Sequence, residues 1–216
     1  IRHADDSLVD WHVTSGNRKN AQMEPMFQDA GVSTHHMSPG FLNPAKVFHF
    51  RRFLARTRFD AVMTLNGMFG GLSLLLAKRA GVPVRIGWHR RSTPAYSASP
   101  GRRLYSSMSS RWLEGSSTRI LSNSEAALDY FHGPKWRDSD MFCVIRNGVD
   151  ASRFRPDPAH RAIVRRELGI PLSSTLIGHV GRFDPAKDHE TLLATVRDVL
   201  DRGLDARLLV AGTGTD

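Results

Sequence analysis

The sequence predicts an α/β protein with two Rossmann-like domains, the first over 1–150 and the beginning of a second over 151–216. Short apolar runs alternate with longer amphipathic segments along almost the whole chain. Such alternation is typical of a parallel sheet with helices packed on its faces. A connector that contains Pro156 and Pro158 interrupts the alternation and marks the expected domain boundary.

The first four predicted elements are a strand over 8–13, a helix over 21–30, a strand over 32–37 and a helix over 44–57. Gly31 ends the first helix, since glycine readily takes the left-handed conformation that follows a helix. Pro44 suits the first turn of the second helix. Val47, Phe50 and Leu54 recur at helical spacing, which gives this helix one apolar face.

The next predicted elements are a strand over 60–65, a helix over 68–80, a strand over 82–86 and a loop over 89–100. Asn66 and Gly67 form the turn between the strand and the helix, because Asn-Gly is a strong turn signal. Gly81 ends the helix. Arginine, serine and proline dominate the loop, which argues against regular structure there.

The last predicted elements of the first domain are a helix over 101–114, a strand over 118–121, a helix over 125–131 and a strand over 142–145. Ser124 is expected to cap the helix that follows it, since its hydroxyl can accept a hydrogen bond from an unpaired helical N–H. The final strand leads into Arg146-Asn-Gly-Val-Asp150. Asn147 and Gly148 in this motif again predict a turn.

The predicted elements after the connector are a helix over 160–168, a strand over 175–180, a helix over 188–201 and a strand over 206–211. Gly169 ends the first of these helices. Two parallel strands leave sheet edges and one face uncovered. We therefore expect 151–216 to be the opening part of a larger domain.

The charge of the chain favours anionic partners. Its 30 lysine and arginine residues exceed its 21 aspartate and glutamate residues, for a net charge of +9. A nucleotide or an anionic lipid surface fits this excess, although the same residues also suit a solvated surface. No aromatic-interleaved basic tract and no zinc-finger spacing is present, so we expect no nucleic acid partner.

Cysteine content and hydropathy limit the cellular compartments in which we expect the protein. Cys143 is the single cysteine, which excludes an internal disulfide and fits a reducing compartment. No run approaches the roughly 18 apolar residues that span a bilayer. We therefore expect a cytoplasmic location, with peripheral contact to the inner face of the cell membrane as an extension.

The segment Ile177-Gly-His-Val-Gly-Arg-Phe-Asp-Pro-Ala-Lys187 is the most informative in the chain. It places Gly181, Arg182 and Lys187 at a strand-to-helix turn, where a helix N-terminus also favours anions. Glycine lets the backbone approach a ligand closely, and the two cations can hold phosphate oxygens. The alternative is an ordinary turn that carries two surface cations.

Several segments in this order resemble the retaining GT-B glycosyltransferases of family 4, of the capsular and exopolysaccharide type. The resemblance lies in 77–89, 120–125, 146–156, 177–187 and 208–214. It implies a GT-B-like fold and the transfer of a sugar, with retention, from a nucleotide-sugar donor to a lipid-linked or saccharide acceptor. It also implies a role in polysaccharide or glycoconjugate biosynthesis.

The resemblance assigns catalytic roles to His89, Arg182 and Lys187. Arg182 and Lys187 would bind the donor diphosphate between the two domains and stabilise the charge on the leaving nucleotide. His89 would lie near the sugar and the scissile bond. The alternative for His89 is a loop histidine that packs on Trp88 and is satisfied by backbone groups.

No cofactor and no metal is expected, because cationic side chains take the place of a metal in this family. His35 and His36 do not suggest a metal site, since adjacent strand residues point to opposite faces. Glu125 and Asp184 lie near strand ends, but nothing in their spacing pairs them as a hydrolase would require.

The remaining candidate residues follow predicted strands and are expected to bind substrate, with a purely structural turn as the alternative at each. Ligands of such folds bind at the carboxyl ends of parallel strands. The substrate-binding set is Asn66, Gly67, Asn147, Gly148, Gly181, Gly212 and Gly214.

The chain departs from the family pattern at both ends. The family's glycine-rich loop is missing before Leu8, and its two-glutamate motif is not reached by Asp216. We therefore expect an incomplete enzyme whose isolated 216 residues do not transfer sugar. The alternatives are a non-catalytic module that binds nucleotides or polyanions, and an unstable remnant.

Overall fold

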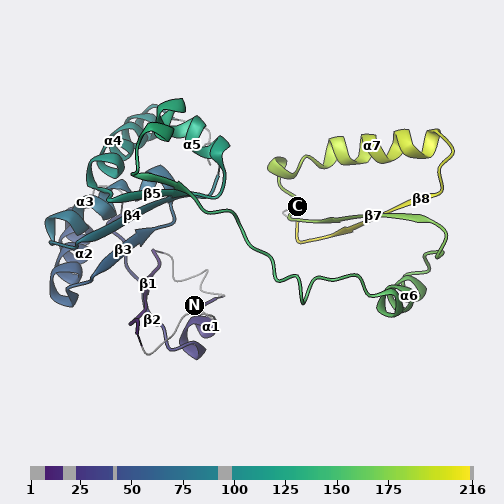
Figure 1. Ribbon diagram of the computed structural model, residues 1–216, viewed down its shortest axis with the longest axis horizontal. Helices are drawn as coiled ribbons and strands as arrows, with labels where there is room; N and C mark the ends of the chain where they lie inside the picture. The colour runs from purple at the N-terminus through teal and green to yellow at the C-terminus, as the bar shows by residue number, and fades with distance from the viewer. Residues whose placement is uncertain (1–7, 17–22, 41–42, 92–98, 215–216) are drawn as a thin grey trace. The chain divides into compact units, whose positions relative to one another are not determined.

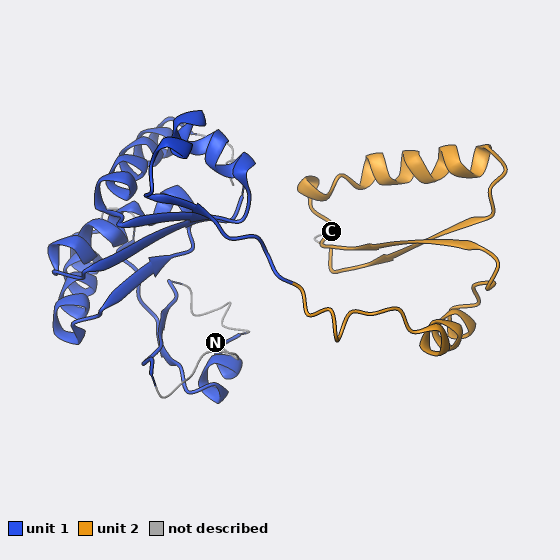
Figure 2. Ribbon diagram, in the orientation of Figure 1, with its two compact units in different colours: residues 1–148 blue, residues 149–216 orange. Residues whose placement is uncertain are grey.

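The computed structural model describes residues 8–16, 23–40, 43–91 and 99–214 of the 216-residue chain. The chain divides into two compact units, 1–148 and 149–216 (Figure 2). Both contain parallel strands with helices between them, so the predicted α/β class is confirmed. The sequence places the domain boundary after Asp150, two residues beyond this division.

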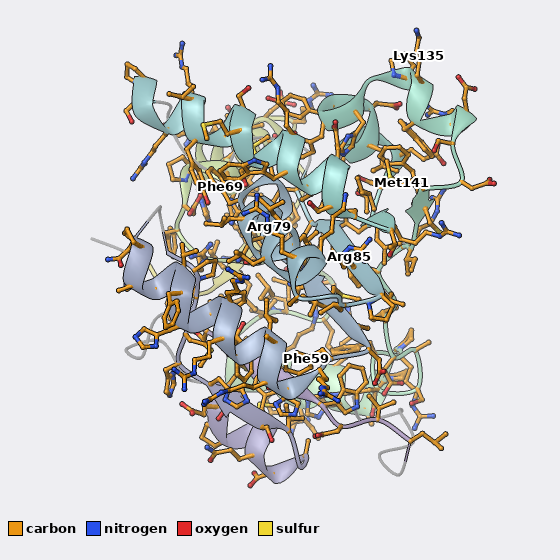
Figure 3. All side chains as sticks on the ribbon, turned by 90° about the vertical axis from the view of Figure 1, so that its left-hand side faces the viewer. Phe59, Phe69, Arg79, Arg85, Lys135 and Met141 are labelled. Carbon is orange, nitrogen blue, oxygen red and sulfur yellow. The ribbon has the colours of Figure 1, made fainter. Side chains whose placement is uncertain are left out.

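A small parallel sheet opens the first unit. It pairs β1 (His12–Thr14) with β2 (Ser33–His35), and α1 (Glu24–Asp29) lies between them in sequence. Both strands are shorter than the predicted 8–13 and 32–37, and residues 21–22 of the predicted helix lie outside the described part. His12 stacks on His35 with ring centroids 5.2 Å apart. The ring of His12 also meets the edge of Phe59, which is labelled in Figure 3, at 5.1 Å.

Four parallel strands form the main sheet of the first unit (Figure 1). They are β3 (Ala61–Thr64), β4 (Val84–His89), β5 (Arg119–Ser122) and β6 (Phe142–Val144), in that order across the sheet. Their carboxyl ends therefore meet at one edge. The register pairs Thr64 with Gly87 and His89 with Ser122 across this edge.

The helices that cover this sheet are α2 (Pro44–Thr57), α3 (Gly71–Arg79), α4 (Pro100–Ser116) and α5 (Glu125–His132). One core cluster gathers Leu74 of α3, Leu113 of α4 and Leu128 of α5 around Ile120 of β5, all fully buried. A second joins apolar side chains of α2 and α3. Burial of these side chains is the main stabilising contribution to the unit.

The helix starts follow the sequence closely. Pro44 occupies the first turn of α2, and Asn43 accepts a hydrogen bond from the Lys46 N–H at 3.2 Å. Ser124 caps α5 as predicted, since its Oγ accepts from the Ala127 N–H at 3.3 Å. Short 3₁₀ turns, η2 (Gly67–Gly70) and η3 (Pro134–Asp138), were not predicted; the first replaces the opening turn of the expected 68–80 helix.

Arginine side chains hold strand ends in both units. Arg85, at the start of β4, donates from Nε to the Ser116 carbonyl at 2.6 Å and from Nη1 to the Pro83 carbonyl at 3.0 Å (Figure 3). In the second unit, buried Arg165 donates to the Ser174 carbonyl at 3.0 Å. These contacts satisfy carbonyls that would otherwise be left without partners.

The second unit pairs β7 (Thr175–Val180) with β8 (Ala206–Ala211) in parallel, both with the predicted bounds. It also contains α6 (Pro158–Glu167), the 3₁₀ turn η4 (Pro185–Lys187) and α7 (His189–Asp201). Asp157 and Asp188 cap the two α-helices by accepting backbone N–H groups. In neither unit does a described helix have the length and apolar character needed to cross a membrane.

Replacing Gly71 with alanine is expected to destabilise the first unit. The added Cβ would lie 1.8 Å from the backbone oxygen of Ser109 and would push α3 away from α4. Overpacking of this kind typically costs about 1–3 kcal/mol. Urea denaturation of the purified chain measures the loss.

Gly115→Ala is the control, because its Cβ would meet nothing within 4 Å. It is expected to match the parent or gain up to about 1 kcal/mol, and equal losses in both variants would contradict this packing.

Candidate functional site

Buried polar side chains gather where β3, β4 and β5 end. Thr64, His89 and Ser122 have exposed fractions of 6%, 2% and 0%. The strand register and the alternation of strand side chains place all three on the same face of the sheet. Polar groups buried in this way need partners, so this row is a candidate site in the first unit.

His89 lies at the end of a strand, which corrects the prediction that it begins a loop. β4 begins two residues later than the expected 82–86 and extends three residues past it, because its last four residues pair with β5. The imidazole stacks on Phe131, with centroids 4.6 Å apart and planes at 17°. The alternative of packing on Trp88 is therefore wrong, since that neighbour faces the other side of the sheet.

The ring nitrogens of His89 have unequal surroundings. Nε2 lies 3.0 Å from Nε2 of His132, whose Nδ1 lies 2.8 Å from Oε1 of Glu114. Nδ1 of His89 is buried and has no hydrogen-bond partner among the described residues. Burial, and to a lesser degree the nearby His132, lowers the pKa of His89 to about 4. His89 is therefore neutral at neutral pH.

The structure brings Gly67 to His89. Gly67 has φ of +54°, and a Cβ there would lie 3.3 Å from Nδ1 of His89. Asn66 precedes it and donates its N–H to Oγ1 of Thr64 at 3.4 Å. Asn147 and Gly148 follow β6 and are exposed.

In the second unit, bare backbone meets at the ends of β7 and β8. A Cβ on Gly212 would lie 1.8 Å from the carbonyl oxygen of Gly181, so only glycine fits there. The Gly181 N–H donates to the Ala211 carbonyl at 2.9 Å. Beyond the strands, Phe183 forms a bridge with Gly214, whose Cβ would lie 3.1 Å from the phenyl ring. The structure thus joins Gly181, Gly212 and Gly214 in one turn region.

The side chains of Arg182 and Lys187 extend from this turn and are exposed. The Arg182 side chain is 72% exposed, and its Nη2 lies 3.9 Å from Oδ2 of Asp184. Asp184 in turn accepts the Ala186 N–H at 2.9 Å and caps η4. The aliphatic Cδ and Cε of Lys187 lie 3.5 Å from the Cβ position of Gly181. Both cations therefore belong to the turn around Gly181.

An aromatic layer that no sequence pattern predicted lies against this turn. His179 and His189 have ring centroids 4.9 Å apart, and Phe183 stacks on His189 at 4.6 Å. The Nε2 atoms of both histidines are buried without a hydrogen-bond partner in the described part of the chain. Their positions at a strand end and a helix start could have indicated that they flank the turn.

The two adjacent histidines near the N-terminus point to different partners. Nε2 of His35 lies 2.9 Å from Nδ1 of His12, whereas Nε2 of His36 lies 3.1 Å from Oε1 of Glu24. Glu125, at the start of α5, pairs with Arg137 and Arg146. No cluster of three or more potential metal ligands occurs among the residues that the structure describes.

Residues 7–148 match the family model described as the glycosyl transferase 4-like domain. The chain belongs to this family of glycosyltransferases. The predicted membership of family 4 is thereby confirmed, whereas retention and the capsular type stay predictions.

Members of known glycosyltransferase families match parts of this chain. EpsF of Bacillus subtilis (strain 168), named as a glycosyltransferase, is 27% identical over 156 residues, which is 72% of this chain and 41% of EpsF. A D-inositol 3-phosphate glycosyltransferase of Corynebacterium jeikeium (strain K411) is 41% identical over 73 residues, which is 33% of this chain and 17% of that protein. The chain spans about two fifths or less of these relatives.

Solved structures share the fold of this chain at low sequence identity. Anabaena Alr3699/HepE, in complex with UDP and glucose, matches 94% of this chain and 68% of its own at 12% identity, with a TM-score of 0.59. A glycosyltransferase from Rickettsia africae matches 95% of this chain and 60% of its own at 12% identity, with a TM-score of 0.56. The predicted GT-B-like fold is confirmed.

The lowered pKa of His89 predicts that the chain loses stability as the pH falls. Unfolded His89 takes up a proton near pH 6.5, whereas folded His89 does so only near 4, so the unfolded state binds more protons between these values. A loss on the order of 3 kcal/mol accumulates over this range. Urea denaturation from pH 7 to pH 4 measures it.

His89→Gln removes the titrating group, so its stability should fall less steeply with pH than that of the parent chain. His49→Gln is the control, because His49 is exposed on α2. Its pH profile should follow the parent. A His89→Gln profile as steep as the parent's would show that other groups cause the loss.

Proposed function

We propose that the turn over 181–187 binds the diphosphate of a nucleotide-sugar donor in a glycosyl transfer reaction. The observation that carries the proposal is the close approach of Gly181 and Gly212, which keeps side chains away from the turn while Arg182 and Lys187 extend from it. Membership of the glycosyltransferase family supports the reaction class. The UDP complex of Anabaena HepE supports the donor class.

The chemistry of the leaving group explains why two cations are needed. Negative charge grows on the diphosphate as the bond to the sugar breaks, and fixed positive groups stabilise it more in the transition state than in the ground state. Arg182 offers a planar fork of donors and Lys187 a compact charge. α7 adds the positive end of its dipole, because it begins at His189, two residues after Lys187. No metal is required in this scheme.

His89 and the Asn66–Gly67 turn form the sugar-binding part of the proposal. His89 is neutral at neutral pH. We therefore expect it to form a hydrogen bond with a sugar hydroxyl rather than an ion pair with a phosphate. Asn147, Gly148, Gly212 and Gly214 follow strand ends in the same manner and complete the proposed substrate-binding set.

The finer reaction features extend the proposal. We infer transfer with retention to a lipid-linked or saccharide acceptor in polysaccharide biosynthesis, at the cytoplasmic side of the cell membrane. Exposed arginines would rest on anionic lipid, at about 1 kcal/mol for each charge near the surface. These arginines are Arg51, Arg52, Arg90, Arg91, Arg102 and Arg103.

Titration of the 216-residue chain with UDP, GDP and heparin tests the proposal. One nucleoside diphosphate is expected to bind with clear preference. Arg182→Ala and Lys187→Ala should each weaken it roughly ten- to hundredfold, as expected for the loss of a charged hydrogen bond. Isothermal titration calorimetry at two salt concentrations measures the affinities.

Arg202→Ala is the matched control, because Arg202 follows the far end of the 13-residue α7, roughly 20 Å from the turn. Its exposed ion pair with Asp198 should contribute little to binding. Equal, salt-sensitive binding of all three ligands would instead support a general polyanion-binding module.

A further inference from the structure

Three titratable side chains in hydrogen-bond contact connect the surface of the first unit to the buried polar row of Thr64, His89 and Ser122. Glu114, near the end of α4, is 45% exposed and accepts a hydrogen bond from Nδ1 of His132 at 2.8 Å. His132, at the end of α5, is 3% exposed and meets Nε2 of His89 at 3.0 Å. The two histidines lie 43 residues apart in sequence, so only the fold brings them together.

Each link in this chain fixes the proton position of the next. A carboxylate can only accept, so Nδ1 of His132 carries a proton. In neutral His132, Nε2 then has a lone pair and must accept. His89 must therefore donate from its own Nε2, which leaves a lone pair on Nδ1. With Glu114 ionised and His132 neutral, this assignment follows from the heavy-atom contacts.

We propose that Glu114 and His132 are positioning residues that hold His89 as its Nε2–H tautomer, so that Nδ1 accepts a hydrogen bond from a carbohydrate hydroxyl. The carbohydrate part rests on the proposed function. Nδ1 is the ring nitrogen that lacks a hydrogen-bond partner among the described residues, and it faces Gly67, where a Cβ would lie only 3.3 Å from it. A lone pair held there selects a ligand that donates a proton, such as an alcohol.

The charge of His132 controls this arrangement. Protonated His132 donates from both nitrogens, so His89 must accept at Nε2 and carry its proton on Nδ1. The same ring nitrogen then changes from acceptor to donor. The described rings against this pair are Phe131 on His89 and Phe142 on His132, which do not titrate. Glu114 is thus the carboxylate in contact with the pair, and it sets the direction of the hydrogen bonds.

Nitrogen-15 NMR of the histidine side chains tests the proposal in the 216-residue chain, because protonated and unprotonated ring nitrogens have well-separated shifts. At neutral pH, His89 should be protonated at Nε2 with roughly tenfold or greater preference. At a low pH at which the spectra show both ring nitrogens of His132 protonated, the proton of His89 should lie on Nδ1.

Three variants separate a positioning role from simple packing. Glu114→Ala should reduce the Nε2–H preference, because it removes the acceptor that orients His132. His132→Phe should reduce it too, since it fills the space without a hydrogen bond. His132→Gln should keep the preference, because its amide oxygen can accept from His89, and should abolish the tautomer change at low pH. His49→Gln, at an exposed position of α2, should change nothing.

A parent chain with His89 protonated at Nδ1 at neutral pH, or an unchanged tautomer in Glu114→Ala, would overturn the proposal. Thermal melts show whether each variant folds. If His132→Phe does not fold, Glu114→Ala decides alone, because Glu114 is half exposed. A failure to bind nucleotide would contradict the proposed role of the turn over 181–187 but would not affect the tautomer result. The two proposals can therefore fail separately.

Discussion

Contact between the backbones of Gly181 and Gly212, at the ends of β7 and β8, is the constraint on which the turn over 181–187 depends. The carbonyl of Gly181 occupies the space that any side chain at position 212 would need. The parallel register of the two strands sets this approach, and the hydrogen bond from Gly181 to Ala211 holds it. The turn that follows therefore carries its cations on a short, fixed segment rather than on a long loop. Preorganisation of this kind lowers the cost of binding.

The same device recurs at the carboxyl edge of the first unit. Gly70 packs against the side chain of Thr64, and Gly71 against the backbone of Ser109. These contacts draw η2 down onto the sheet and set Gly67 beside His89. In both units, glycine gives the chain close access to a polar group at a strand end. The sequence alone does not distinguish the glycines. In the structure, a Cβ would clash at some of them, whereas at others, such as Gly115, it would meet nothing within 4 Å.

Local chemistry made much of the fold predictable. α2 has its predicted bounds because Asn43 and Pro44 start it and Arg58 ends it in the left-handed conformation. β7 and β8 were also placed correctly. β4 was predicted to begin and end too early, because its last residues pair with β5, a strand distant in sequence. The site residues likewise divide into those that local motifs indicated and those that only the fold brings together. Motifs indicated Arg182, Lys187 and His89, whose roles stay predictions, but no local pattern links His89 to His132 and Glu114.

Mapping UDP-glucose binding by amide chemical shifts tests the central claim most directly. A diphosphate held by the turn should shift the amide signals of 181–189 and 212–214 most strongly, in a saturable manner. The signals of α6 and of the far end of α7 should stay in place. Shifts spread over the exposed arginines of the first unit, or no saturable shift near Gly181, would contradict the account.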